Sequence, residues 1–270
     1  LRGVVNGAIA GLLLISTSLG AEPVRNGFDL SHALIPAAEI HGGGPPRDGI
    51  PAIYTPRFVK PQDAIRLSAN DRVLGTFVDG VAKAFPVEIL DHHEVVNDWT
   101  QAPHMVVTYC PLCGSGMAFK TPEAGQAVFG VSGLLYNSDV LLYDHATESL
   151  WSQVLGQAVS GPKAGARLEQ VPLIHTSYGQ WLERHPDTWV LSRDTGYRGV
   201  PYGRSPYRGY EKSSRIWFPI AERDSRYPAK AWVLGVTLDG VNRAYPFVEL
   251  KKTSGEFVDE VGGHKLSIHY

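Results

Sequence analysis

"RVLGTFVDGVAKAFPVEIL" occupies residues 72–90, and "WVLGVTLDGVNRAYPFVEL" repeats its pattern at residues 232–250. Nine of the nineteen aligned positions are identical, at a constant offset of 160 residues. In both stretches an apolar run reaches an Asp-Gly pair, and a second run of alternating apolar residues follows. Asp-Gly between such runs is a strong signal for a β-hairpin. A proline then precedes a short segment that favours a helical turn. The sequence therefore predicts one strand–turn–strand–helical-turn unit twice.

The likeness between the two stretches extends weakly beyond them, back to Phe58 and Phe218 and forward to residues 109 and 270. We predict two related β-rich units, 58–109 and 218–270, within a single β-rich domain of residues 22–270. The 29 glycines and 19 prolines of the 270-residue chain favour many turns over long helices. The expected fold is mostly β (α+β), with hairpins and a few short helices. One amphipathic helix is expected within residues 176–192, capped near Thr176 or Ser177.

The N-terminal residues 1–21 have the pattern of a signal peptide. Arg2 precedes an apolar stretch at residues 8–19, and small residues suitable for cleavage follow. We expect export to the periplasm or the extracellular space. An uncleaved membrane anchor is the alternative, and no stable membrane span is expected once the signal is cleaved.

The net charge of the chain is −2, without the surplus of basic residues that is typical of a nucleic-acid-binding protein, so no nucleic-acid partner is expected. The sequence indicates no particular protein partner.

Cys110 and Cys113 are the only cysteines of the chain, and they form one Cys-Pro-Leu-Cys motif. Such a pair can bind a metal, cycle through a disulfide, or form a permanent disulfide. Inert thiols are a further possibility. The run Gly114-Ser115-Gly116 is poor at starting a helix, which argues against a thioredoxin-like site. Two cysteines also cannot supply a Cys₄ zinc site. Thiolates with a histidine would suit copper or zinc.

"DHHEVVND" at residues 91–98 supplies the candidate histidine. If residues 104–109 form a strand, the chain can return beside this segment and bring a histidine near the sulfurs. His93 is the expected third ligand, and in a helical turn it would share a face with Asn97. Glu94, Asn97 or Asp98 is expected to orient its imidazole without binding the ion itself. A solvated polar turn is the alternative interpretation.

Two other polar segments have simpler interpretations. Between residues 130 and 153, several side chains could line a pocket: Ser132, Asn137, Ser138, Asp139, Asp144, Glu148, Ser152 and Gln153. Turn chemistry on hairpins is the favoured explanation for them. The loop at residues 197–210 alternates tyrosines with arginines and could bind anionic or sugar ligands. Tyrosines that pack on a sheet, with arginines left in water, are the favoured alternative.

The chain resembles a bacterial and archaeal family known as domain of unknown function 3179. The resemblance rests on these ordered motifs: "GGPPRDGIPAI", "HEVVND", "TYCPLCGSG", "FGVSGLLYNSDVLLYD", "ESLWSQ" and "HPDTWVLS". It runs from about His41 to the end of the chain. The Cys-Pro-Leu-Cys and His-Glu-x-x-Asn-Asp motifs match at Cys110, Cys113 and residues 93–98. An aromatic residue often replaces His92 in the family, which makes His92 the weaker ligand candidate. The resemblance implies a shared site and no established reaction.

Three hypotheses follow for the role of the protein. The first is an exported protein that binds copper or zinc through Cys110, Cys113 and His93. The second is a thiol–disulfide oxidoreductase that uses the same cysteines. The third is a non-enzymatic binding module with a structural disulfide. The sequence leaves open whether the protein is an enzyme.

Overall fold

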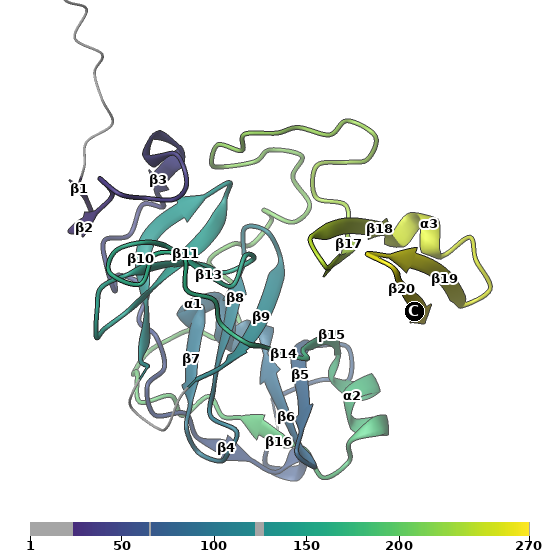
Figure 1. Cartoon of the computed structure of the whole chain (residues 1–270). Helices are drawn as coiled ribbons and strands as arrows, with labels where there is room; N and C mark the ends of the chain where they lie inside the picture. The colour runs from purple at the N-terminus through teal and green to yellow at the C-terminus, as the bar shows by residue number, and fades with distance from the viewer. Residues whose placement is uncertain (1–23, 65, 122–126, 270) are drawn as a thin grey trace, which may run out of the picture.

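The computed structural model of the chain describes residues 24–64, 66–121 and 127–269. The predicted signal segment lies outside the described residues. The structure is mostly β with few short helices, as expected (Figure 1). Within the described residues, no helix has both the length and the apolar character needed to cross a bilayer.

Two antiparallel sheets pack together around the middle of the chain. The first has the strand order β14-β9-β8-β7, and the second has the order β13-β12-β11-β10-β3. Their shared core contains Val106 and Phe119 from the first sheet and Val131, Leu142 and Trp151 from the second. The strands of the first sheet are β7 (Val95–Asp98), β8 (Met105–Cys110), β9 (Ser115–Lys120) and β14 (Gln170–Val171). Those of the second are β3 (Ile40–Gly42), β10 (Phe129–Tyr136), β11 (Asp139–Asp144), β12 (Leu150–Ser152) and β13 (Gln157–Ser160).

A third sheet, in the order β15-β5-β6-β16-β4, contains the first predicted hairpin. Its strands pair antiparallel, except that β16 runs parallel to β6. Leu74 and Phe85 of the hairpin pack with Ile89 of helix α1 (Val87–His93) and with Val107 of β8. The strands are β4 (Phe58–Val59), β5 (Arg72–Val78), β6 (Val81–Pro86), β15 (Ile174–Ser177) and β16 (Trp189–Leu191).

The remaining elements of this part of the chain are short. Strands β1 (Val24–Arg25) and β2 (Phe28–Asp29) form a small ribbon, and single 3₁₀ turns occupy η1 (Ala37–Glu39) and η2 (Pro61–Asp63). Helix α2 (Tyr178–Arg184) lies within the predicted segment, and the Ser177 hydroxyl caps it by accepting a hydrogen bond from the backbone N–H of Gln180.

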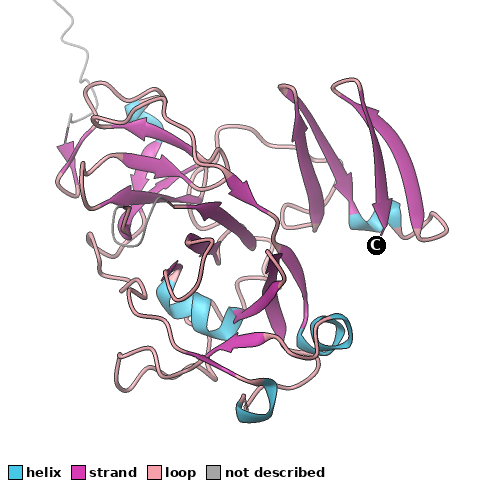
Figure 2. Ribbon diagram, turned by 60° about the horizontal axis from the view of Figure 1, so that its bottom comes forward, coloured by secondary structure: helices cyan, strands magenta, loops and turns pink. Residues whose placement is uncertain are grey.

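The second predicted hairpin has the same order of elements as the first. It comprises β17 (Val233–Leu238), β18 (Val241–Pro246) and α3 (Phe247–Leu250), and a further hairpin follows, β19 (Glu256–Val261) with β20 (His264–His269). The Asp-Gly pairs at 79–80 and 239–240 both have positive φ, as a tight hairpin turn requires. These last hairpins lie apart from the three larger sheets (Figure 2). The duplication and the single-domain assignment remain predictions.

Candidate metal centre

The Cys-Pro-Leu-Cys motif forms the tight turn between β8 and β9. Cys110 ends β8 and pairs with Ser115 across the turn, so the motif opens no helix. Gly114 has a φ of +65°, a left-handed conformation that glycine adopts without strain. Cys110 is buried and Cys113 is exposed, and both thiols are free. The turn therefore brings the sulfurs of a buried and an exposed cysteine within 4.8 Å of each other.

Asp139 completes a group of three ligand atoms. It begins β11 directly after a turn in which Asn137 and Ser138 both have positive φ. The donor atoms of Cys110, Cys113 and Asp139 all lie within 4.8 Å of one another, so the group could hold a metal ion. The Cys113 thiol donates a hydrogen bond to Asp139 Oδ1 at 3.1 Å, and the backbone N–H of Val154 donates to Oδ2 at 3.2 Å.

The surroundings of this group disfavour negative charge. Burial raises the pKa of Asp139 to about 6, although hydrogen bonds to its carboxylate oppose the shift. Burial also raises the pKa of the Cys110 thiol well above its ordinary value, and Cys113 and Asp139 add to this effect. Among the described residues, no ion pair joins Asp139 to a cationic side chain. A bound cation would compensate the negative charge of the Asp139 carboxylate and of the thiolates, and it would displace the protons from these groups.

Glu94 is a second buried acid close to this group. Its backbone has a φ of +56°, its N–H bonds Leu90 at the end of α1, and its carbonyl accepts from the N–H of Tyr109. The Tyr207 hydroxyl donates to its carboxylate at 2.8 Å. Burial raises the pKa of Glu94 to about 7, and the charge of Asp139 contributes to the shift. The backbone link through Tyr109 places Glu94 next to Cys110 in the fold.

His93, the expected third ligand, is bonded elsewhere in this structure. Its Nδ1 donates to the Pro51 carbonyl at 2.7 Å, and its Nε2 lies 2.7 Å from the Tyr202 hydroxyl. Burial lowers its pKa and favours the neutral ring. An imidazole with both nitrogens in hydrogen bonds has no free lone pair for an ion. In this conformation Asp139, rather than His93, accompanies the two sulfurs.

The residues after His93 form a strand instead of a continued helical turn. The left-handed backbone of Glu94 ends α1, so His93 and Asn97 do not share a helix face. Asn97 instead joins β7 to β10, because its side chain accepts from the Phe129 N–H and donates to the Phe129 carbonyl, both at 2.9 Å. Asp98 forms a buried ion pair with Lys83 at 2.6 Å. The side chains of Asn97 and Asp98 therefore bond to Phe129 and Lys83 and not to the His93 ring. The expected pairing of β7 with β8 is present.

The tyrosines of the 197–210 loop bind buried polar groups through their hydroxyls. Tyr197 donates to the Ala52 carbonyl, Tyr202 contacts His93, and Tyr207 donates to Glu94. This segment, defined here as the tyrosine loop, thus lies over the end of α1, beside the thiols. The expectation that its arginines lie in water agrees with the exposure of Arg198, Arg204 and Arg208.

The sequence places Asp139 among the possible pocket residues but favours turn chemistry as the explanation for it. That explanation suits Asp144, which bonds Thr147 and the Trp151 indole, and Ser132, which bonds the backbone at a β-bulge. It fails for Asp139, whose carboxylate faces Cys113. The sequence feature that could identify Asp139 as a ligand candidate is an acidic residue immediately after a two-residue turn, at the start of a strongly apolar strand.

The chain matches the model of a known protein family. The family described as "Protein of unknown function (DUF3179)" matches residues 47–270. No curated protein and no solved structure matches the chain significantly.

Proposed function

Since the chain belongs to the DUF3179 family, whose description assigns no activity, we propose a function from its site: the protein binds a metal ion through Cys110, Cys113 and Asp139. One observation carries the proposal, namely that two thiols and one carboxylate lie within 4.8 Å of one another. Three protein ligands leave one position of a tetrahedral ion for water or a further ligand.

The ligand types favour zinc over copper. Zinc accepts thiolate and carboxylate ligands together, whereas copper(I) prefers sulfur and imidazole. A carboxylate in place of the expected imidazole therefore moves the preference towards zinc. Two thiolates and one carboxylate carry three negative charges, so a divalent cation would leave a net charge of −1 at the centre.

Zinc content tests this proposal. Protein purified without a polyhistidine tag, reduced, exposed to zinc and dialysed should retain about one ion per chain by elemental analysis. Cys110→Ser and Cys113→Ser should abolish stoichiometric retention, and Asp139→Asn should weaken zinc binding by about tenfold or more. Reduced wild-type protein that retains neither ion, when zinc and copper are offered in separate samples, would contradict the proposal.

His93→Gln separates the two candidate third ligands. If Asp139 is the ligand, the folded His93→Gln protein should keep its zinc, because His93 lies outside the ligand group. If His93 turns towards the sulfurs when zinc arrives, His93→Gln should lose zinc while Asp139→Asn keeps it. A thermal unfolding curve in the presence of chelator shows whether each variant is folded before zinc is added.

Thiol–disulfide exchange is a second candidate, favoured by the unequal exposure of the cysteines. Cys113 is accessible and Cys110 is buried in the same turn. Cys113 would then be the attacking thiol, and Cys110 would resolve the mixed disulfide. Cys110→Ser should trap a mixed disulfide on Cys113 with a small disulfide such as oxidised glutathione. Cys113→Ser should trap none, which is the reverse of the order typical of thioredoxin-like motifs.

We also propose that the protein is exported, on the basis of the signal pattern at residues 1–21. Fractionation of cells that express the full chain should place the protein outside the cytoplasm, with the first residues removed. Deletion of residues 8–19 should retain it in the cytoplasm. The proposal would be contradicted if the full chain and the variant without residues 8–19 were distributed in the same way between the cytoplasm and the other fractions.

A further inference from the structure

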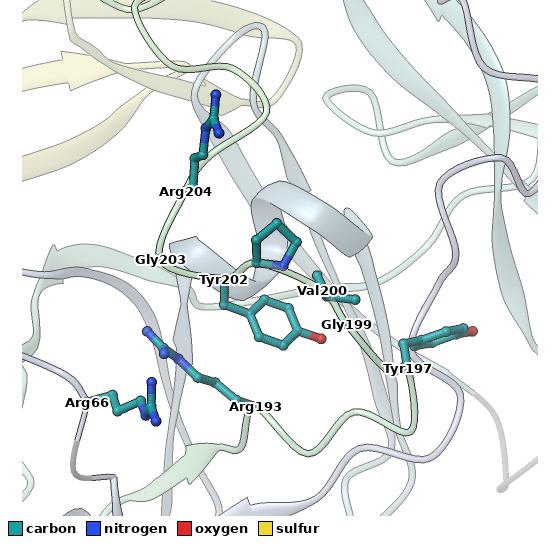
Figure 3. A pocket seen from close by; sticks show the side chains of 9 residues that line it. Arg66, Arg193, Tyr197, Gly199, Val200, Tyr202, Gly203 and Arg204 are labelled. Atoms are coloured by element: carbon teal, nitrogen blue, oxygen red, sulfur yellow. The ribbon is translucent and has the colours of Figure 1, made fainter.

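A pocket of about 520 Å³ is lined mainly by residues of the tyrosine loop. Arg66, Arg193 and Arg204 line it together with Tyr197 and Tyr202, and none of the acidic side chains that the structure describes lines it. In Figure 3, Arg66 and Arg193 lie on the same side of the Tyr202 ring, while the Arg204 side chain extends away from them.

The two neighbouring guanidinium groups have hydrogen-bond donors to spare. Arg193 uses Nε and Nη2 for a bidentate pair with Glu88, at 2.7 and 2.6 Å. Its Nη1 makes no hydrogen bond to the residues that the structure describes. Arg66 is exposed and makes no ion pair or side-chain hydrogen bond within the same residues. Arg193 is therefore paired with one carboxylate and Arg66 with none among the described residues. Their free donors have the planar geometry that suits carboxylate and phosphate oxygens.

A second, smaller pocket of about 190 Å³ adjoins the first through the shared walls of Arg66 and Arg193. Its lining is mainly apolar, with Leu67, Ile89 and Leu191 among the side chains. Asp63 and Glu88 also line this second pocket and would repel an anion there. A ligand that spans both pockets would therefore place its anionic end at the arginines and its apolar end in the smaller pocket.

We propose that the two pockets form one binding site for a small amphipathic anion, a carboxylate or phosphate ester attached to an apolar group. The anionic oxygens accept hydrogen bonds from Arg66 and from Arg193 Nη1. Glu88 holds the Arg193 side chain in position from the opposite edge of the guanidinium. The site is separate from the metal centre, and binding of the anion does not require the metal.

Calorimetric titration with phenyl phosphate and phenylacetate tests the proposal. Arg66→Gln should weaken binding by about tenfold, because each charge-assisted pair contributes substantially to affinity. Arg66 has no partner whose loss would unfold the chain. Arg204→Gln should have a smaller effect, since its side chain extends away from the arginine pair. Arg208→Gln is the matched control: it removes the same charge from an exposed position of the tyrosine loop that does not line the pocket.

The probes also distinguish the parts of the ligand. Tighter binding of phenyl phosphate than of phenylacetate would identify a phosphate ligand, and the reverse would identify a carboxylate. Inorganic phosphate should bind more weakly than phenyl phosphate, because it leaves the apolar pocket empty. The proposal is wrong if neither aromatic probe binds at concentrations up to about 10 mM. It is equally wrong if Arg208→Gln weakens binding as much as Arg66→Gln, since the attraction would then be a general effect of charge.

Discussion

Glu94 and Asp139 are carboxylic acids enclosed beside the two thiols, and their protonation couples the site to pH. Burial raises the pKa of Glu94 from its ordinary value of 4.5 to about 7, and that of Asp139 from 3.8 to about 6. A raised carboxyl pKa means that the folded chain keeps a proton that the unfolded chain releases. The stability of the metal-free protein is therefore highest below the unfolded pKa values and is lost as the pH rises through the folded ones. A bound cation reverses this preference, because it stabilises the carboxylates.

Replacement of Glu94 by glutamine should remove part of this pH dependence. With chelator and reductant present, the wild-type protein should lose stability between about pH 5 and about pH 8, with an upper bound on the order of 3 kcal/mol from Glu94. Glu94→Gln should lose less, because the amide does not ionise and can still accept the Tyr207 hydrogen bond. Urea unfolding midpoints at both pH values measure the difference. Glu183→Gln, an exposed change on α2, is the control, and equal pH dependence in Glu94→Gln and wild type would exclude Glu94 as the source.

The two cysteines should differ in their reaction with alkylating reagents. In reduced, metal-free protein, iodoacetamide should modify Cys113 at least about tenfold faster than Cys110, because Cys110 is buried and burial raises its pKa. Zinc should protect both sulfurs if both bind the ion. Mass spectrometry of the modified peptides measures each rate. Fast modification of Cys110 would show that the turn opens readily, and undiminished modification of Cys113 with zinc bound would exclude it as a ligand.

At the scale of elements, a buried ion pair joins β6 to the end of β7 that pairs with Met105, the opposite end of β8 from Cys110. Lys83 and Asp98 have side chains only 4% and 0% exposed, and Thr100 also bonds both of them. Removal of one partner leaves the other charge buried without compensation, which is more damaging than removal of both charges. The attraction between Lys83 and Asp98 therefore adds little stability by itself. Separation of the two strands is costly instead because it would leave a buried charge without its partner.

Lys83→Met should destabilise the protein by about 3 kcal/mol, because it leaves Asp98 unpaired. The double variant Lys83→Met/Asp98→Asn should recover a large part of this loss, since the asparagine is neutral and keeps an oxygen for the Thr100 hydrogen bonds. Urea unfolding of the two variants and the wild type provides the comparison. If the double variant is as unstable as the single one, the lost lysine packing, rather than the unpaired charge, causes the destabilisation.

The elements that the sequence predicted well are those whose signals are local. An Asp-Gly pair determines a hairpin within its own few residues, and a serine cap determines the start of α2 in the same way. The metal group depends instead on long-range packing: Asp139 lies 26 residues after Cys113 and arrives on a different sheet. The position of His93 depends on the left-handed backbone of Glu94, an unusual conformation for glutamate that composition and spacing do not indicate.

At the scale of the whole molecule, the two similar hairpins have different surroundings. Hairpin β5–β6 pairs with β15 on one side and β16 on the other, whereas β17–β18 forms a two-stranded sheet within the described residues. The consequence is visible in equivalent side chains: Val73 and Leu74 are 0% and 1% exposed, while Val233 and Leu234 are 47% and 37% exposed. Similar sequences thus form the same local structure with very unequal burial, because a hairpin alone does not create a core.

Hydrogen exchange should therefore separate the two hairpins within one molecule. Amides of β17–β18 should exchange at least about tenfold faster than those of β5–β6, because an isolated two-stranded ribbon opens locally at low free-energy cost. Mass spectrometry of peptides that cover residues 72–86 and 233–246 measures both rates in the same sample, and the similar sequences serve as mutual controls. Equal, slow exchange at every protein concentration would show that β17–β18 is stable without neighbouring strands. Slow exchange that appears only at high concentration would instead show that a second copy of the chain covers its exposed strands, since self-association protects amides by mass action.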